Sequence, residues 1–350
     1  MKRRIHTILL ALIVLIAVTF TAFNFDSRSN LGVQTSVPTT SAAATGTSTS
    51  AAGTSAAATA TSTGTAATGT SVAAETPEPN APIILTPVAS GTTVRKNARI
   101  EIDISNTKDG YVMIRTINRH STLTKVLITD PKGVVHTYRL RTDTEWDVFP
   151  LASGNGSYTI GVFRNISGNQ FSTDFSITTR VTIADEFAPF LRPNQFVNYN
   201  EKTLAVIEAA TLVKDATTPL EKIDIIYKFV TSEFSYDTAL ARSVQSGYVP
   251  DLDKAWNSKK GICFCIASVT AAMLRSQGIP TKLVFGYVGE VYHAWISVWT
   301  EETGWVDSAI YFDGEKWVLM DPTFRVGASS SQSLARFIGD GSRYTVRFNF

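Results

Sequence analysis

The sequence contains little cysteine and little histidine. Its 350 residues include two cysteines, Cys263 and Cys265, and four histidines. A bridge between cysteines two positions apart would hold nothing together, so a disulfide framework is excluded. A zinc site on the two thiols would need two more ligands, and His293 is the one soft ligand near them in the sequence. We therefore expect no metal and no cofactor.

Concentrated positive charge is also missing. The formal net charge is +2, and lysine and arginine cluster only in residues 1–4. A nucleic-acid-binding surface needs a dense group of basic side chains, because binding depends on displacing counterions from phosphates. The sequence therefore indicates that nucleic acid is not a partner.

The N-terminal segment combines this basic start with an apolar run over residues 8–23. As a helix the run would span ~24 Å, against ~30 Å of bilayer hydrocarbon. It is short for a spanning helix and long for the core of a signal peptide, and no small-x-small cleavage site follows it. An uncleaved membrane anchor and a removed signal peptide therefore both stay open for residues 1–26, with the anchor favoured. Either way the basic start predicts that the rest of the chain lies outside the cytoplasm and contacts the membrane only through this segment.

A long segment without charge follows. Residues 31–74 contain no charged side chain and consist mostly of threonine, serine, alanine and glycine. Such a sequence buries too little apolar surface to offset the entropy lost on ordering. We predict a disordered tether over residues 27–82.

Strand patterns dominate residues 83–185. Residues 100–104 alternate apolar and acidic side chains, as a half-buried strand does. Asp130-Pro-Lys-Gly133 predicts a turn between two strands. Asn155-Gly156 predicts a hairpin that joins residues 149–151 to residues 158–163. Short strands at regular spacing predict a β-sandwich domain, in which His120 and His136 are ordinary surface or sheet residues.

From residue 190 to residue 350 the pattern changes to an α+β domain. Helices are expected over residues 201–213 and from Pro219 onward, where apolar side chains recur at helical spacing. A third helix is expected to begin at or just after Cys263 and to end before Gly278 and Pro280. Strands follow this helix, so the fold class is α+β.

Cys263 and His293 are the candidate chemical pair of this domain. At a helix start, unpaired N–H groups and the helix dipole favour a thiolate, although a free cysteine can also be a small buried apolar residue. His293 is the only histidine after residue 136 and can serve as the base that a thiol nucleophile needs. An acidic residue should orient the imidazole, and composition alone leaves Asp307 and Asp321 as alternatives.

Five short motifs follow one another in this region: Gly261-x-Cys263-x-x-x-Ala267, Leu274-Arg-Ser-Gln-Gly-Ile-Pro280, Gly286-Tyr287, His293-Ala-Trp295 and Trp317-x-x-x-Asp321-Pro-Thr323. In order and spacing they resemble the motifs of the transglutaminase-like superfamily, and in particular those of bacterial envelope proteins with a tether and a β-domain. The resemblance implies a papain-like core, in which a cysteine-bearing helix packs on an antiparallel sheet.

The same resemblance implies a catalytic triad of Cys263 as nucleophile, His293 as base and Asp321 as third member. One position departs from the pattern: many relatives carry an acid two residues after the nucleophile, where this chain has Cys265. Cys265 can be inert packing, a redox partner or a sign that the activity has been lost.

The sequence thus predicts an extracytoplasmic, cysteine-dependent acyl transferase or hydrolase. It would act on protein or peptide amide bonds through an acyl-enzyme thioester, with cell-envelope proteins as candidate substrates. Hydrolysis and crosslinking are not separated by the sequence. The alternative, which the departure at Cys265 leaves open, is a non-catalytic envelope-associated binding or scaffold protein with a degenerate domain.

Overall fold

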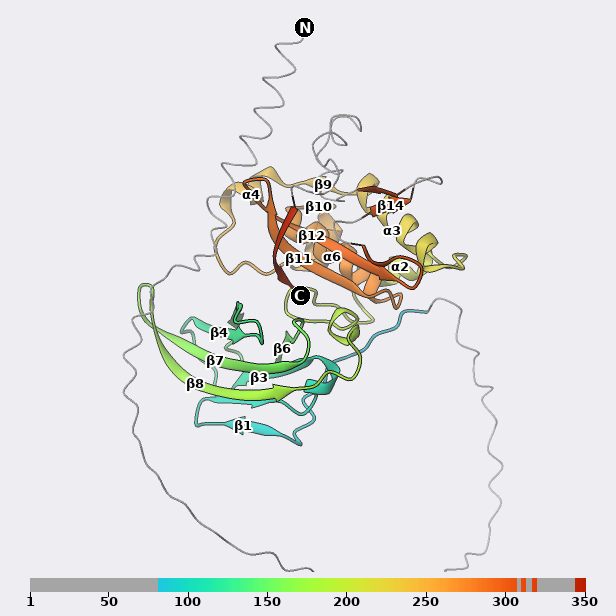
Figure 1. Ribbon diagram of the computed structural model, residues 1–350. Helices are drawn as coiled ribbons and strands as arrows, with labels where there is room; N and C mark the ends of the chain where they lie inside the picture. Colours follow the sequence, from blue (N-terminus) through green and yellow to red (C-terminus); the bar gives the residue numbers. More distant parts are fainter. Residues whose placement is uncertain (1–80, 307–309, 313–316, 320–343) are drawn as a thin grey trace, which may run out of the picture. The chain divides into compact units, whose positions relative to one another are not determined.

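The computed structural model describes residues 81–306, 310–312, 317–319 and 344–350 (Figure 1). The anchor or signal peptide predicted for residues 1–26, and the tether except for its last two residues, lie outside the described residues. Within the described ranges, no helix combines the length and the apolar character that crossing a bilayer requires.

The first part of the described chain consists of two antiparallel four-stranded sheets, with strand orders β1-β2-β3-β6 and β5-β4-β7-β8. The strands are β1 (Val94–Lys96), β2 (Ile100–Asp103), β3 (Tyr111–Thr116), β4 (Thr124–Thr129), β5 (Val135–Leu140), β6 (Asp147–Pro150), β7 (Gly156–Ser167) and β8 (Gln170–Val181). Buried side chains of both sheets, such as Ile114 and Ile160, belong to one apolar core. The two sheets confirm the predicted sandwich-like architecture.

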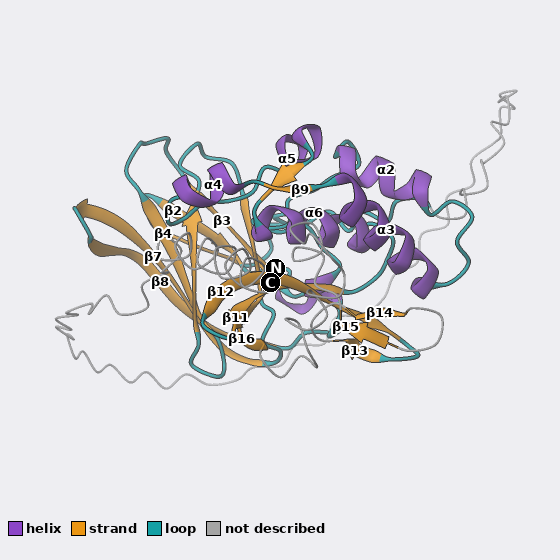
Figure 2. Cartoon of the chain, turned by 90° about the horizontal axis from the view of Figure 1, so that it is seen from above, coloured by secondary structure: helices purple, strands orange, loops and turns teal. Residues whose placement is uncertain are grey.

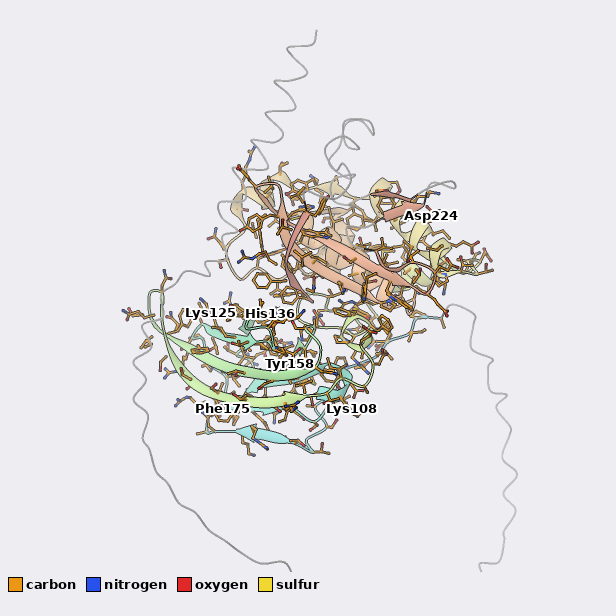
Figure 3. All side chains as sticks on the ribbon, viewed as in Figure 1. Lys108, Lys125, His136, Tyr158, Phe175 and Asp224 are labelled. Carbon is orange, nitrogen blue, oxygen red and sulfur yellow. The ribbon has the colours of Figure 1, made fainter. Side chains whose placement is uncertain are left out.

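The predicted turn after β4 is confirmed. β4 and β5 pair antiparallel across it, and the N–H of Gly133 donates to the carbonyl oxygen of Asp130 at 3.0 Å. The Asp130 carboxylate accepts the N–H groups of Lys132 and Val134 at 2.9 and 2.8 Å. Gly133 has φ of +81°, a backbone conformation that side chains other than glycine rarely adopt. His136 lies on β5 as a buried sheet residue (Figure 3), with Nε2 3.3 Å from Oδ2 of Asp130.

The predicted hairpin at Asn155-Gly156 is wrong. β6 pairs with β3, where Phe149 lies opposite Val112, while β7 pairs with β4 and β8 in the other sheet. The intervening chain crosses from one sheet to the other and is held by local bonds. Oδ1 of Asn155 accepts the N–H of Ile183 at 2.7 Å, and the Tyr158 hydroxyl donates to Gly154 O at 2.8 Å. Burial of Phe149 in the first sheet overrides the local turn signal.

The second part is α+β. Its helices are η3 (Ala188–Phe190), α2 (Leu204–Leu212), α3 (Pro219–Glu233), α4 (Thr238–Ser243), α5 (Leu252–Ser258) and α6 (Cys263–Arg275). Its strands are β9 (Ser235–Tyr236), β10 (Lys260–Gly261), β11 (Thr281–Val288), β12 (Val291–Thr300), β13 (Gly304–Val306), β14 (Ile310–Phe312), β15 (Trp317–Leu319) and β16 (Tyr344–Asn349). The main sheet is antiparallel, in the order β13-β12-β11-β16.

Helix α6 is fully buried and organises this second part. It packs on β11 and β12 on one side and against α2, α3 and α5 on the other (Figure 2). This arrangement confirms the predicted cysteine-bearing helix on an antiparallel sheet. The three predicted helix starts are confirmed to within three residues, and α3 begins with a capping box between Thr218 and Glu221.

Arg275, the last residue of α6, holds the end of the sheet. Its guanidinium donates to the main-chain oxygens of Thr281, Arg192 and Phe350 at 2.7 to 2.9 Å. Complete burial lowers its pKa to about 10. Phe350 in turn packs edge-on against Tyr138 of β5, at 5.6 Å between ring centroids. The arginine thus connects the helix, the sheet and a residue that contacts the sandwich.

Candidate active site

A short rigid segment leads the chain into Cys263. Strand β10 pairs in parallel with β9, and the N–H of Asp237 donates to Gly261 O at 2.9 Å. Just before β10, Lys259 adopts a left-handed conformation with φ of +48°, and its ammonium lies 3.1 Å from the ring centroid of Trp256. Gly261 has no room for a side chain, because an added Cβ would lie 2.5 Å from Cβ of Cys265. These contacts fix the position of the helix start.

Cys263 is the first residue of α6, as the sequence predicts. The preceding Ile262 is extended, with φ of −80° and ψ of 173°, and provides no capping side chain. The first turn also contains no acidic residue. Its N–H groups and the positive end of the helix dipole are therefore not neutralised by a local carboxylate. The residue as a whole is 4% exposed.

Cys265 is a packed, neutral thiol. Its sulfur lies 3.3 Å from the Tyr248 hydroxyl, and the residue is buried. Burial raises the pKa of the Cys265 thiol, and the hydrogen bond from Tyr248 opposes the shift. Negative charge at Cys263 also contributes to the raised pKa of Cys265.

Two further phenols lie within electrostatic range of Cys263, and sequence reasoning missed both. Burial is the main reason that the pKa of Tyr236 and the pKa of Tyr292 are raised, and negative charge at Cys263 contributes to each. The pairing of β9 with β10 brings Tyr236 near Cys263, and no local sequence pattern predicts this pairing. Tyr292 precedes His293 on β12, so a survey of polar residues beside the expected base would have found it. Both phenols stay protonated near neutral pH and can donate hydrogen bonds.

His293 lies near the start of β12 and is buried. It shares a strand face with Trp295, and the two rings stack with centroids 6.2 Å apart at 18°. Gly286 lies opposite His293 on β11. It has no room for a side chain, because an added Cβ would lie 2.0 Å from Thr345 O and 2.7 Å from Cη2 of Trp295. Because α6 packs against β12, the two elements that carry Cys263 and His293 are in direct contact.

The third candidate, Asp321, and its alternative, Asp307, lie outside the described residues. Asp307 directly follows β13, which pairs with β12, and Asp321 follows β15, which pairs with β14. The assignment of the third residue therefore stays a prediction. Among the residues that the structure describes, no group of three or more histidine, cysteine or acidic side chains could hold a metal ion.

Comparison with known proteins agrees with the sequence motifs. Residues 208–322, about a third of the chain, match the model of the Transglutaminase-like superfamily. This match confirms the resemblance over the segment that contains Cys263, His293 and Asp321. No curated protein matches the chain.

Several solved structures resemble the chain at low identity. A candidate cysteine protease from Cytophaga hutchinsonii is 13% identical, with a TM-score of 0.36, over 69% of this chain and 83% of the other. A candidate protease from Parabacteroides distasonis is 16% identical, with a TM-score of 0.28, over 45% of this chain and 36% of the other. Red sea bream transglutaminase is 12% identical, with a TM-score of 0.25, over 61% of this chain and 48% of the other. The chain thus spans less than half the length of the last two.

Proposed function

We propose that the protein is a cysteine-dependent acyl transferase or hydrolase that acts on protein or peptide amide bonds outside the cytoplasm. Cys263 is the nucleophile, His293 the base and Asp321 the residue that orients the imidazole. The observation that carries the proposal is the position of Cys263 at the uncapped start of a buried helix that packs against the strand of His293.

The chemistry follows from these positions. The Cys263 thiolate attacks the carboxamide carbon and forms a carbon–sulfur bond, while His293 gives its proton to the nitrogen that leaves. The N–H groups at the start of α6 can stabilise the negative oxygen of the tetrahedral intermediate. Water then hydrolyses the thioester and yields an acid, or a lysine amine attacks it and yields an isopeptide bond. The apolar run after a basic start supports action outside the cytoplasm.

Alkylation tests the nucleophile directly. Cys263 should react with iodoacetamide faster than Cys265 near pH 7, because burial raises the pKa of Cys265 and keeps that thiol neutral. Peptide mapping by mass spectrometry gives the rate at each thiol. Equal rates at both cysteines, matching those of the unfolded chain, would refute an activated nucleophile.

The reaction itself can be found with an extract of envelope proteins. We expect cleavage, deamidation or isopeptide bonds after incubation with the wild-type protein, and none of these after incubation with the Cys263→Ala variant. Identical product spectra from the two proteins would refute the proposed activity.

A second candidate function is a non-catalytic envelope scaffold, and one observation favours it. Cys263 is 4% exposed, so in this conformation its sulfur is not open to a bulky substrate. One measurement, the reaction of Cys263 with an activated acyl donor, separates the two proposals. A catalyst forms a covalent thioester with an activated acyl donor at Cys263, whereas a scaffold leaves the thiol unmodified.

A further inference from the structure

Two neighbouring cavities share lining residues at the end of strand β5 of the sandwich. The first has a volume of about 580 Å³ and is formed by the segment after β3, residues 119–124, and the end of β5 with the residues after it, 139–143. The second, of about 230 Å³, shares Arg139, Leu140 and Arg141 with the first. We name the two neighbouring cavities together the arginine groove. The volume of the first alone falls in the range of ligand sites.

The first cavity carries an excess of positive charge. Three arginines line it, Arg119, Arg139 and Arg141, together with one acidic residue, Asp143. Asp143 is already engaged, since its Oδ2 lies 2.6 Å from Nη2 of Arg141. Within the described ranges, no ion pair is made by the guanidinium of Arg119 or of Arg139. Two guanidinium groups are therefore left to face an anionic ligand.

The second cavity has a different lining. Polar residues that line it include Asn194, Gln195 and Asn198, and apolar residues include Trp146 and Val249. The one acidic residue that lines it, Asp147, is buried and accepts the N–H of Arg141 at 2.7 Å. Amide and apolar walls beside guanidinium groups suit a peptide better than a phosphate polymer, which has neither amide groups nor apolar side chains.

The arginine groove also reaches the loop that contacts the cysteine helix. Val249, in the second cavity, follows Tyr248, whose hydroxyl lies 3.3 Å from the sulfur of Cys265. Gly247 of the same loop lies close to the side chain of Arg139, since a Cβ added to the glycine would be 4.0 Å from Cδ of the arginine. A ligand in the groove would thus lie against the segment that packs on the start of α6.

We propose that the arginine groove binds an acidic peptide segment of the protein substrate, with carboxylates at Arg119 and Arg139 and peptide groups along the amide-lined wall. This inference rests on the proposed function for the identity of its ligand as a substrate. It assigns the sandwich a role in choosing substrates, and the cysteine helix the chemical step.

Binding is tested on the full chain carrying Cys263→Ser, so that catalysis plays no part in the readout. The probe is fluorescein-labelled hexaglutamate, followed by fluorescence anisotropy at low salt. Exposed ion pairs are individually weak, so the double change Arg119→Ser and Arg139→Ser should weaken binding about tenfold, which corresponds to about 1.4 kcal/mol. A double change of Arg119 and Arg139 to lysine, which keeps the charge, should recover part of this loss.

The matched control removes the same charge elsewhere on the sandwich. Arg95 and Arg180 lie on β1 and β8, are exposed, and line neither cavity. Their double change to serine should alter binding less than about twofold. If both double changes weaken hexaglutamate binding equally, the proposal is overturned, because the peptide then binds to diffuse positive charge on the surface and not to the arginine groove. Polyphosphate binding without hexaglutamate binding would overturn it in favour of a phosphate polymer. If the arginine groove does not bind hexaglutamate, the proposal of acyl transfer at Cys263 still stands. The two proposals can therefore be refuted separately.

Discussion

The change Gly286→Ala tests how the sheet positions the candidate base. Gly286 lies on β11 between His293 of β12 and Val346 of β16. An added Cβ would lie 2.0 Å from Thr345 O, whereas ordinary contact begins at 3.4 Å. The carbonyl must therefore move by about 1.4 Å, or the new methyl group must displace Trp295 on the other side. Because Trp295 stacks on His293, displacing the indole disturbs the imidazole.

The cost can be worked from these contacts. Overpacking costs ~1–3 kcal/mol, and each β11–β16 hydrogen bond lost costs ~1 kcal/mol more, so we expect a loss of about 2–4 kcal/mol. Urea unfolding measures it. Gly133→Ala is the matched control, since its Cβ meets nothing within 4 Å and only the strain at φ of +81° remains, about 1 kcal/mol. If Gly286→Ala unfolds like the wild type and alkylates Cys263 at the same rate, the reasoning is refuted.

Three further changes test the rest of the account. Arg275→Met removes the donor from three buried carbonyls and should cost about 3 kcal/mol in urea unfolding, whereas the exposed Arg242→Met should cost under ~0.5 kcal/mol. Burial raises the pKa of Asp147 to about 6, above its ordinary 3.8. The folded state therefore binds more protons between about pH 4 and pH 6, and stability falls as pH rises through that window. Asp147→Asn should abolish this slope and raise stability at pH 7.5 by about 1–3 kcal/mol, as thermal unfolding across pH would reveal. Asp321→Asn should reduce turnover by up to ~10⁴, as the matching change does in serine triads, while Asp307→Asn should be mild. The opposite ranking would reassign the third residue.

Local signals were sufficient to predict the helix that carries Cys263. Gly278, with φ of +73°, and Pro280 mark the end of α6, and apolar spacing marks its buried face. Gly261 indicates a tight entry into the helix, and the structure places the start at Cys263 as predicted. Each of these features depends on residues within one or two turns of the helix, so a single sequence contains the information.

Features that depend on distant residues were not predictable. Arginine is a residue type that is mostly exposed, yet Arg275 is buried and its three acceptors include Arg192 and Phe350, far away in the sequence. Asn155-Gly156 has the composition of a hairpin turn, yet strand β6 finds its partner in β3. Tyr236 reaches the neighbourhood of Cys263 only because β9 pairs with β10. In each case long-range packing or pairing decided the outcome, and local propensity did not.

The departure at Cys265 takes on a different meaning once its surroundings are known. An acid at this position would introduce a negative charge into the first turn of α6 and would accept the N–H groups there. The thiol of Cys265 is instead kept neutral by burial and is held by the Tyr248 hydroxyl. The first turn of α6 thus carries no carboxylate that would oppose the negative charge of the proposed acyl transfer, first on the Cys263 sulfur and then on the oxygen of the intermediate. Cys265 is therefore compatible with catalysis and is not by itself a sign that the activity has been lost.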